Sequence, residues 1–202
     1  MQMDKELSCA GFPCADVRHD CYVVPPVQVR PNDISIMLIS EAAPADHGDY
    51  YYAKGRPLFL QTTLQAFNDA AAKVSSLQDI LALGVYLTTA VKCGKTGYGI
   101  KASTIEECSS ILRKEMAQFP NVGAFLLMGD VAIKAINCIA HEAGEQRVIP
   151  VGSTYKIRRH EYFFQRKRVF PSYLQAGPSI FIEKSKRKMI AEDIAAALGL
   201  VK

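Results

Sequence analysis

The sequence predicts an α/β fold, a three-layer α/β/α sandwich around a central, mainly parallel sheet of four strands. Short apolar runs, such as 34–39 and 122–128, have the length and composition of strands that are buried on both faces. Longer amphipathic segments separate these runs, and strands that alternate with helices are typical of a parallel sheet. With 202 residues, 49% of them hydrophobic, the chain is large enough for one compact domain.

The elements are expected in the following order along the chain. Strands are predicted over 34–39, 85–91, 122–128, 148–151, 156–159 and 162–169. Helices are predicted over 58–74, 77–83, 103–118 and 131–142, and a final helix carries Ile190, Ile194 and Leu198 on one face. Right-handed crossovers bring the loops that follow parallel strands to the carboxyl edge of the sheet. The loops after Ser40, Lys92 and Met128 would then form one mouth, which the loop after Pro171 could join.

The first 33 residues have no such pattern. They are irregular and contain three cysteines and several prolines, so we expect an arm packed on a domain of residues 34–202. No stretch reaches the roughly 18 uninterrupted apolar residues that span a bilayer. Residues 1–7 are polar and lack the apolar core of a secretory signal. We therefore expect a cytoplasmic monomer with no membrane partner.

The number of cysteines, six, is high for such a protein. Disulfides are disfavoured in a reducing compartment, so metal ligation or catalysis explains a set of cysteines better there. Cys93 ends a predicted strand and Cys108 lies in the next helix, while Cys9 and Cys14 lie in the arm. Four thiolates that converge from an arm and a loop-helix unit suit a zinc ion or a cubane cluster. The alternative is a set of unrelated buried thiols.

The other two cysteines are less informative. Cys138 shares an apolar helix face with Ala132, Ala135 and Ile136, which places it in the core. Cys21 is either a substitute for one of the arm ligands or no ligand at all.

The loop after the first strand, 40–49, combines small residues with ionisable ones. Small residues let the backbone approach a ligand closely, and Asp46, His47 and Asp49 are possible proton-transfer groups at the carboxyl edge of the sheet. The alternative is a polar loop that contains an Asx turn.

Two features near the C-terminus admit either a binding or a purely structural interpretation. The segment 169–179 is a strand that runs into a loop rich in Pro, Gly and Ser, which could hold a phosphate or form a plain turn. Basic residues also gather in the last quarter, where they could face phosphate or solvent. These are Arg158, Arg159, Arg166, Lys167, Arg168, Lys184, Lys186, Arg187 and Lys188. The net charge of +4 is too small to establish nucleic-acid binding.

Taken together, these segments resemble the uracil-DNA glycosylase superfamily, in particular its iron-sulfur branches, often numbered four and five. The most specific piece is 87–93, Leu-Thr-Thr-Ala-Val-Lys-Cys, followed by the Glu-Glu-Cys of 106–108. It is similar to the family's strand ending in Val-Lys-Cys and its helix with the fourth cysteine. The segment 43–48, Ala-Pro-Ala-Asp-His-Gly, resembles the Ala-Pro-Ala-Ala-His-Gly loop of the fifth branch. Further similar segments are Gly55-Arg56-Pro57 with Phe59, Met128-Gly129-Asp130-Val131-Ala132 and Val169-Phe170-Pro171.

The resemblance implies a fold, an activity and a cofactor. The family has the three-layer architecture predicted above, flips a deaminated base out of DNA and hydrolyses its N-glycosidic bond. In these branches a structural [4Fe-4S] cluster pins the arm, which implies Cys9, Cys14, Cys93 and Cys108 as its ligands. Spacing alone leaves zinc as the alternative. DNA is the implied partner.

The chain departs from the family pattern at three places. Ser40 and Ala43 change the family's first motif, Thr89 occupies the place of the asparagine that reads the base, and Leu174 occupies the place of the second motif's histidine. Thr cannot pair with two edge atoms of uracil at once, and Leu cannot stabilise a developing oxyanion.

Three functions remain open after these departures. In an active glycosylase, Asp46 or Asp49 would activate water in a pocket formed by Glu41, Ala43, Phe59, Thr89 and Leu174. A catalytically impaired relative would instead act as a DNA-binding iron-sulfur protein. An unrelated small-molecule ligand in the same pocket is the third possibility.

Overall fold

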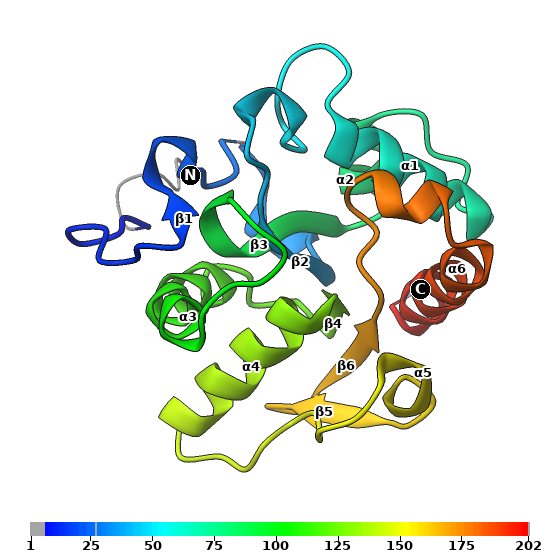
Figure 1. Ribbon diagram of the computed structural model, residues 1–202. Coiled ribbons are helices and arrows are strands. Elements are labelled where there is room, and N and C mark those ends of the chain that lie inside the picture. Colours follow the sequence, from blue (N-terminus) through cyan, green and yellow to red (C-terminus); the bar gives the residue numbers. More distant parts are fainter. Residues whose placement is uncertain (1–6, 27, 202) are drawn as a thin grey trace.

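A computed structural model describes residues 7–26 and 28–201, and Figure 1 shows its arrangement. Residues 1–6, which belong to the predicted arm and to the polar segment at the N-terminus, therefore lie outside the described residues. In the described part the sheet has six strands in the order β1-β3-β2-β4-β6-β5. The strands are β1 Val17–Arg18, β2 Ile36–Ala43, β3 Val85–Lys95, β4 Ala124–Met128, β5 Tyr162–Phe164 and β6 Lys167–Ser172.

Four of these strands form the predicted parallel sheet. β2 pairs in parallel with β3 and with β4, and β4 pairs in parallel with β6. Residues 36–39 of β2 are completely buried, as a strand covered by helices on both faces must be. The predicted α/β fold is confirmed, with six strands in place of four.

Helices cover both faces of the sheet. α3 (Ala102–Met116) and α4 (Asp130–Glu142) pack on one face, and α1 (Leu58–Asp69), α2 (Leu77–Ala82) and α6 (Lys184–Leu200) pack on the other (Figure 1). The short α5 (Thr154–Ile157) follows α4. The 3₁₀ helices are η2 His19–Cys21, η3 Pro31–Asp33, η4 His47–Asp49 and η5 Pro178–Phe181. No described helix is long and apolar enough to cross a membrane.

The region between α4 and α6 differs from the prediction. Residues 148–151 form no strand, and 156–159 belong to α5 and the turn after it. The predicted strand 162–169 is a hairpin, in which β5 and β6 pair antiparallel around Gln165 and Arg166. Both turn residues have positive φ, 48° and 64°, as a two-residue type I′ turn requires. The sequence lacks the Asn-Gly pair that usually marks such a turn.

The arm reaches the opposite edge of the sheet through β1. β1 pairs antiparallel with the end of β3, where Val17 faces Lys95 and Arg18 faces Gly94. The backbone N–H of Val23 also donates to the carbonyl of Lys92 at 2.9 Å. The arm is thus joined to the sheet beside the end of the strand that carries Cys93.

An ion pair between α1 and α6 gives a pH-dependent prediction. Arg187 donates to Asp69 and holds the pKa of that carboxyl below its usual 3.8. A carboxyl whose pKa is lowered by folding stabilises the folded state above its unfolded pKa, and this contribution is lost as the pH falls through the folded value. Arg187→Ala should lower the free energy of unfolding by up to about 1 kcal/mol at pH 7, and by almost nothing near pH 2. Urea denaturation at pH 7 and near pH 2 measures the free energy of unfolding, with Lys188→Ala as the control. An equal loss of stability in Arg187→Ala at both pH values would contradict the prediction.

Candidate functional site

A pocket of about 540 Å³ opens at the carboxyl edge of the parallel strands. The loops that follow β2, β3 and β6 form it, together with the start of α1, as expected for a ligand site in an open α/β sheet. Its walls are residues 41–45, Asp49, Leu58, Phe59, 95–98, Leu174 and 176–179. Of the residues that the sequence pointed to, the structure therefore brings together Glu41, Ala43, Asp49, Phe59 and Leu174.

The pocket contains an ion pair that the sequence did not reveal. Lys95 Nζ lies 2.9 Å from Glu41 Oε2, and the two side chains are 28% and 14% exposed. Glu41 also packs against Gly129, which precedes α4 and has a φ of 101°. A Cβ at Gly129 would lie only 2.7 Å from the Glu41 side chain, so glycine is needed there for both conformation and space. The carboxylate thus lies between an ammonium group and the N-terminus of a helix, two positive neighbours.

The two aspartates predicted as catalytic lie in different surroundings. Asp49 lines the pocket, and its Oδ1 accepts from the backbone N–H of Leu58, the first residue of α1, at 3.3 Å. Asp46 is exposed and is not part of the pocket wall; its Oδ1 accepts from the N–H of Gly48 at 2.8 Å. This bond is the Asx turn that the sequence left open as an alternative. His47 donates to the carbonyl of Asp20 in the arm at 2.5 Å.

Thr89 does not line the pocket. It is fully buried in β3 opposite Ser40 of β2, and its hydroxyl finds no hydrogen-bond partner among the described residues. The part of this strand that lines the pocket is its last residue, Lys95.

Gln175 fixes the loop that carries Leu174, and sequence reasoning missed it. Its amide nitrogen donates to Ser40 Oγ and to the Tyr51 hydroxyl, both at 3.0 Å, and lies 3.3 Å from Thr63 Oγ1. All four side chains are completely buried. These bonds join β2, α1 and the segment after β6, and so hold Leu174 at the pocket wall. The only signal for Gln175 in the sequence is that an amide side chain stands in the middle of a loop rich in Pro and Gly.

A comparison with protein families now identifies the chain. The model of the uracil DNA glycosylase superfamily matches residues 26–192. The chain belongs to this superfamily. None of the curated proteins compared with it matches. The match covers every strand from β2 onward, including β3 with Cys93, and the helix α3 with Cys108, but it begins after the three cysteines of the arm.

The cysteines of this uracil-DNA glycosylase superfamily member gather where the arm meets β3 and α3. Cys93 and Cys108 are buried, and Cys9 and Cys14 are half-buried against the same core. Burial raises the pKa of Cys93 to about 12, and the charges of Cys108, Cys9 and Cys14 add to this effect. Burial likewise raises the pKa of Cys108 to about 11, again with Cys14 and Cys9 as neighbours. Cys93 is thus within electrostatic reach of Cys9, Cys14, Cys21 and Cys108, and Cys108 is within reach of Cys9 and Cys14.

Cys21 makes a different contact. It is buried, and its thiol donates to the carbonyl of Ala45 in the pocket wall at 3.3 Å. In the described part of the chain, no three His, Cys, Asp or Glu side chains are arranged around a single metal ion.

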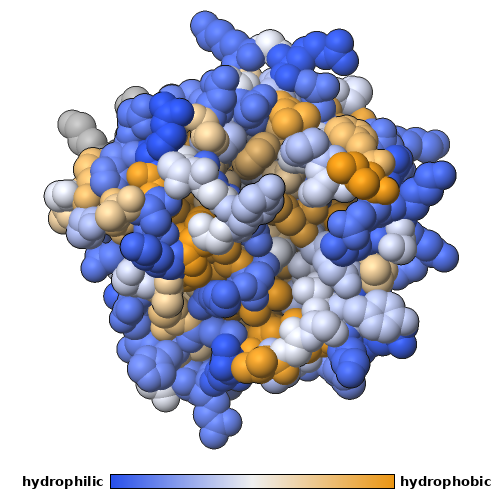
Figure 2. All heavy atoms as spheres, in the orientation of Figure 1, coloured by the Kyte–Doolittle hydropathy of each residue, from blue (hydrophilic) through white to orange (hydrophobic). Residues whose placement is uncertain are grey.

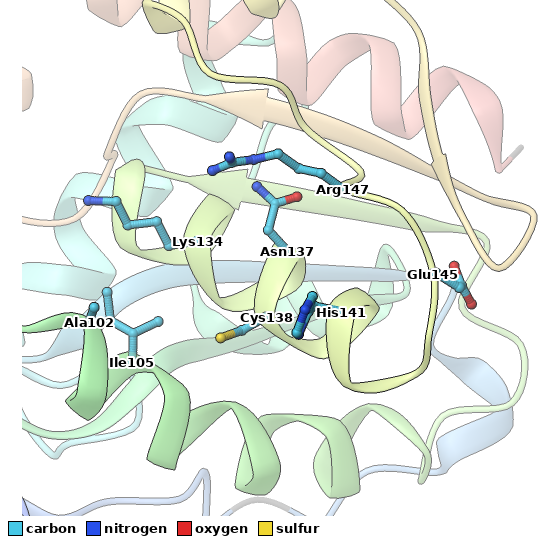
Figure 3. A pocket seen from close by; sticks show the side chains of 8 residues that line it. All are labelled: Ala102, Ile105, Lys134, Asn137, Cys138, His141, Glu145 and Arg147. Atoms are coloured by element: carbon cyan, nitrogen blue, oxygen red, sulfur yellow. The ribbon is translucent and has the colours of Figure 1, made fainter.

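A second pocket, of about 420 Å³, lies between α3 and α4 (Figure 3). Cys138, expected in the core, is half-buried and lines this pocket with Ile105. Asn137 exchanges two hydrogen bonds with the backbone of Ile149, and Arg147 Nε donates to the same carbonyl. These contacts hold the loop after α4 in place and give Asn137 and Arg147 a structural role.

Several basic residues of the last quarter stabilise the fold. Arg158 is only 10% exposed and binds Asp193 of α6 at 2.6 Å, and Arg187 binds Asp69. Lys186 pairs with Glu183 at 2.7 Å and lines a hollow that adjoins the pocket at Glu41 and Leu174.

Proposed function

We propose that this protein hydrolyses the N-glycosidic bond of a deaminated or damaged base in DNA. The observation that carries the proposal is the pocket at the carboxyl edge of the sheet, in a chain of the uracil-DNA glycosylase superfamily. Its volume of about 540 Å³ is within the range of small-ligand sites and admits a flipped base. Its walls are mainly apolar, with Asp49, Glu41 and Lys95 as the charged groups.

We assign each of four pocket residues a role in base binding or in hydrolysis. Phe59 offers an aromatic wall for a base. Asp49 Oδ1 is engaged with α1, and we assign its carboxylate the task of orienting the attacking water. Lys95 takes over the electrostatic role that Leu174 cannot perform, since its ammonium group can stabilise negative charge on the departing base. Glu41 holds Lys95 in position at 2.9 Å.

The surface around the pocket fits a nucleic acid. Tyr98 at the pocket wall is fully exposed, and Phe181 and Ile182, just after the opposite wall, are 54% and 77% exposed. Figure 2 shows hydrophobic residues in patches near the middle of the view, with hydrophilic residues around them. Exposed aromatic and aliphatic side chains beside a pocket suit stacking on bases or insertion between them.

The iron-sulfur branch is part of the proposal. Cys9, Cys14, Cys93 and Cys108 supply the four thiolates that a [4Fe-4S] cluster needs. The support for this assignment is that all four lie where the arm packs on β3 and α3, with Cys9, Cys14 and Cys108 as electrostatic neighbours of Cys93. When bound, the cluster would join the arm to β3 and α3 and supply no chemistry to the base. Zinc on the same thiolates is the alternative.

A second candidate function is DNA binding without catalysis. The apolar Leu174 in the pocket wall and the absence of Thr89 from that wall favour it. Such a protein would keep the exposed apolar side chains and the cluster, and would retain damaged or single-stranded DNA without releasing a base.

Base release distinguishes the two functions. Protein kept anaerobic is incubated with oligonucleotides that carry uracil, hypoxanthine, xanthine or a thymine mismatch, and abasic sites are quantified. Asp49→Asn and Lys95→Met should each lower the rate of release by about 10² or more. Asp46→Asn, outside the pocket, is the matched control and should leave the rate within a factor of about three.

Each alternative has its own outcome. Salt-dependent binding without release in the wild type would favour the non-catalytic binder. Neither binding nor release would favour a small-molecule ligand in the pocket. An equal loss of base-release rate in Asp46→Asn and Asp49→Asn would contradict the role assigned to Asp49 in orienting the attacking water.

A further inference from the structure

The segment 16–21 of the arm contacts the two loops that form neighbouring walls of the pocket. One loop, 43–49, follows β2, and the other, 95–101, leads from β3 to α3. The segment pairs with the end of β3 through Val17 and Arg18. Its position allows one short piece of chain to contact both walls.

Asp16 holds the loop between β3 and α3 at both ends. Its backbone carbonyl accepts from Thr96 Oγ1 at 2.9 Å, next to the residues that line the pocket. Its carboxylate accepts from the N–H of Lys101 at 2.7 Å and from Thr104 Oγ1 at 2.5 Å, at the start of α3. Gly97 and Tyr98 of the pocket wall lie between these points of attachment.

The other end of the segment holds the loop after β2. Arg18 Nη1 and the Cys21 thiol both donate to the carbonyl of Ala45, at 3.0 and 3.3 Å. In return His47 donates to the carbonyl of Asp20 at 2.5 Å. Asp20 also binds the guanidinium of Arg18 at 2.6 Å, which fixes the direction of that side chain.

Gly94 shows how tightly these parts meet. A Cβ built there would lie 2.7 Å from the Cβ of Cys21 and 2.9 Å from the carbonyl oxygen of Pro44. Both distances are shorter than van der Waals contact, and neither atom is the end of a flexible side chain. The arm, β3 and the loop after β2 therefore fit together only because residue 94 has no side chain.

We propose that segment 16–21 is the positioning element of the pocket, and that Cys21 serves it as a hydrogen-bond donor and not as a ligand. The arm sets the distance between the two walls, so the fit of a base depends on the arm being seated. The role in base binding rests on the proposed function; the positioning of the loops does not.

Hydrogen exchange measured by mass spectrometry tests the positioning directly. Arg18→Ala and Cys21→Ala should speed exchange in 43–49 roughly five- to tenfold, and Asp16→Ala should do so in 95–101, because each loses about one or two hydrogen bonds. Exchange in β4 and α6 should not change. Cys21→Ser keeps a donor and should restore slow exchange. Arg30→Ala is the matched control, since Arg30 pairs with Asp33 in the arm without contact to either loop.

Gly94→Ala offers a test that removes no hydrogen-bonding group. The added methyl group should speed exchange in 43–49 and in the arm around Cys21 together. Iron is measured in every variant, and Cys21→Ser should keep the iron content of the wild type. Affinity for an oligonucleotide carrying uracil, measured at one salt concentration, should fall several-fold in Arg18→Ala and Asp16→Ala.

The outcomes separate this inference from the proposed function. Unchanged exchange in both loops, or loss of iron in Cys21→Ser, would overturn the inference whatever the activity of the protein. If the variants exchange faster but the wild-type protein neither binds nor cleaves DNA, the inference about the positioning element stands and the proposed function is wrong.

Discussion

Cys93→Ser is expected to abolish iron binding and to lower the thermal stability of the protein. Cys93 is buried at the end of β3 and has Cys9, Cys14 and Cys108 as electrostatic neighbours. A structural metal centre contributes its binding free energy to folding, so loss of one ligand should loosen the arm as well as release iron. Iron and sulfide analysis, the visible absorption spectrum and the melting temperature of anaerobically purified protein measure the effect.

The control for this prediction is Cys138→Ser. Cys138 is another cysteine with a free thiol, half-buried where Cys93 is buried, but it lies on α4 beside the second pocket, and its replacement should leave iron unchanged. A wild-type protein that contains neither iron nor zinc when purified without oxygen would contradict the prediction. If the purified protein contains zinc and no iron, the assignment of the four cysteine ligands stands, and the metal is zinc instead of a [4Fe-4S] cluster.

Lys92→Met is expected to destabilise the fold by about 3–5 kcal/mol. Lys92 Nζ lies 2.5 Å from Glu115 Oε2, and both side chains are completely inaccessible to solvent. The carboxylate also accepts from the hydroxyls of Tyr86 and Thr88 at 2.9 Å. Removal of the ammonium group leaves a buried carboxylate without its counter-charge, and this is far more costly than the loss of an exposed ion pair.

A double variant shows whether the pair itself causes the effect. Lys92→Met combined with Glu115→Gln removes both charges and should recover much of the loss, so the two changes should not be additive. Urea denaturation of the four proteins gives the coupling free energy. A single-variant cost below about 1 kcal/mol would show that the interior accommodates the isolated carboxylate. Iron content must be measured in parallel, because Lys92 precedes Cys93.

The parallel part of the fold was predictable because its signal is local. Buried parallel strands have continuous apolar sequences, and the runs at 36–39 and 124–128 are of this kind. The two edge strands gave no such signal. β1 has only two residues, and the β5–β6 turn places Gln165 and Arg166 at positive φ without glycine or asparagine. In both places tertiary contacts determine a conformation that the local sequence does not favour.

The candidate site was predictable in part for the same reason. Glu41, near the end of β2, and Asp49, in the loop after it, were found because the carboxyl edge of a parallel sheet collects ligand-binding residues. Lys95 was missed because its partner Glu41 is 54 residues away, and no local pattern marks such a pair. The resemblance led us to expect Thr89 in the pocket, but this residue is fully buried in β3 and does not line the pocket.

The shortness of both edge strands has a consequence for how the protein behaves when it is damaged. An open sheet edge offers unpaired backbone groups to any other extended chain, and short edge strands reduce this danger. Here β1 and the backbone bond from Val23 cover the end of β3, an otherwise long and apolar strand. Oxidation of the cysteines that frees the arm would uncover that edge of β3 and open its backbone groups to pairing with another extended chain. The arm therefore shields this end of β3 from aggregation as well as closing the sheet.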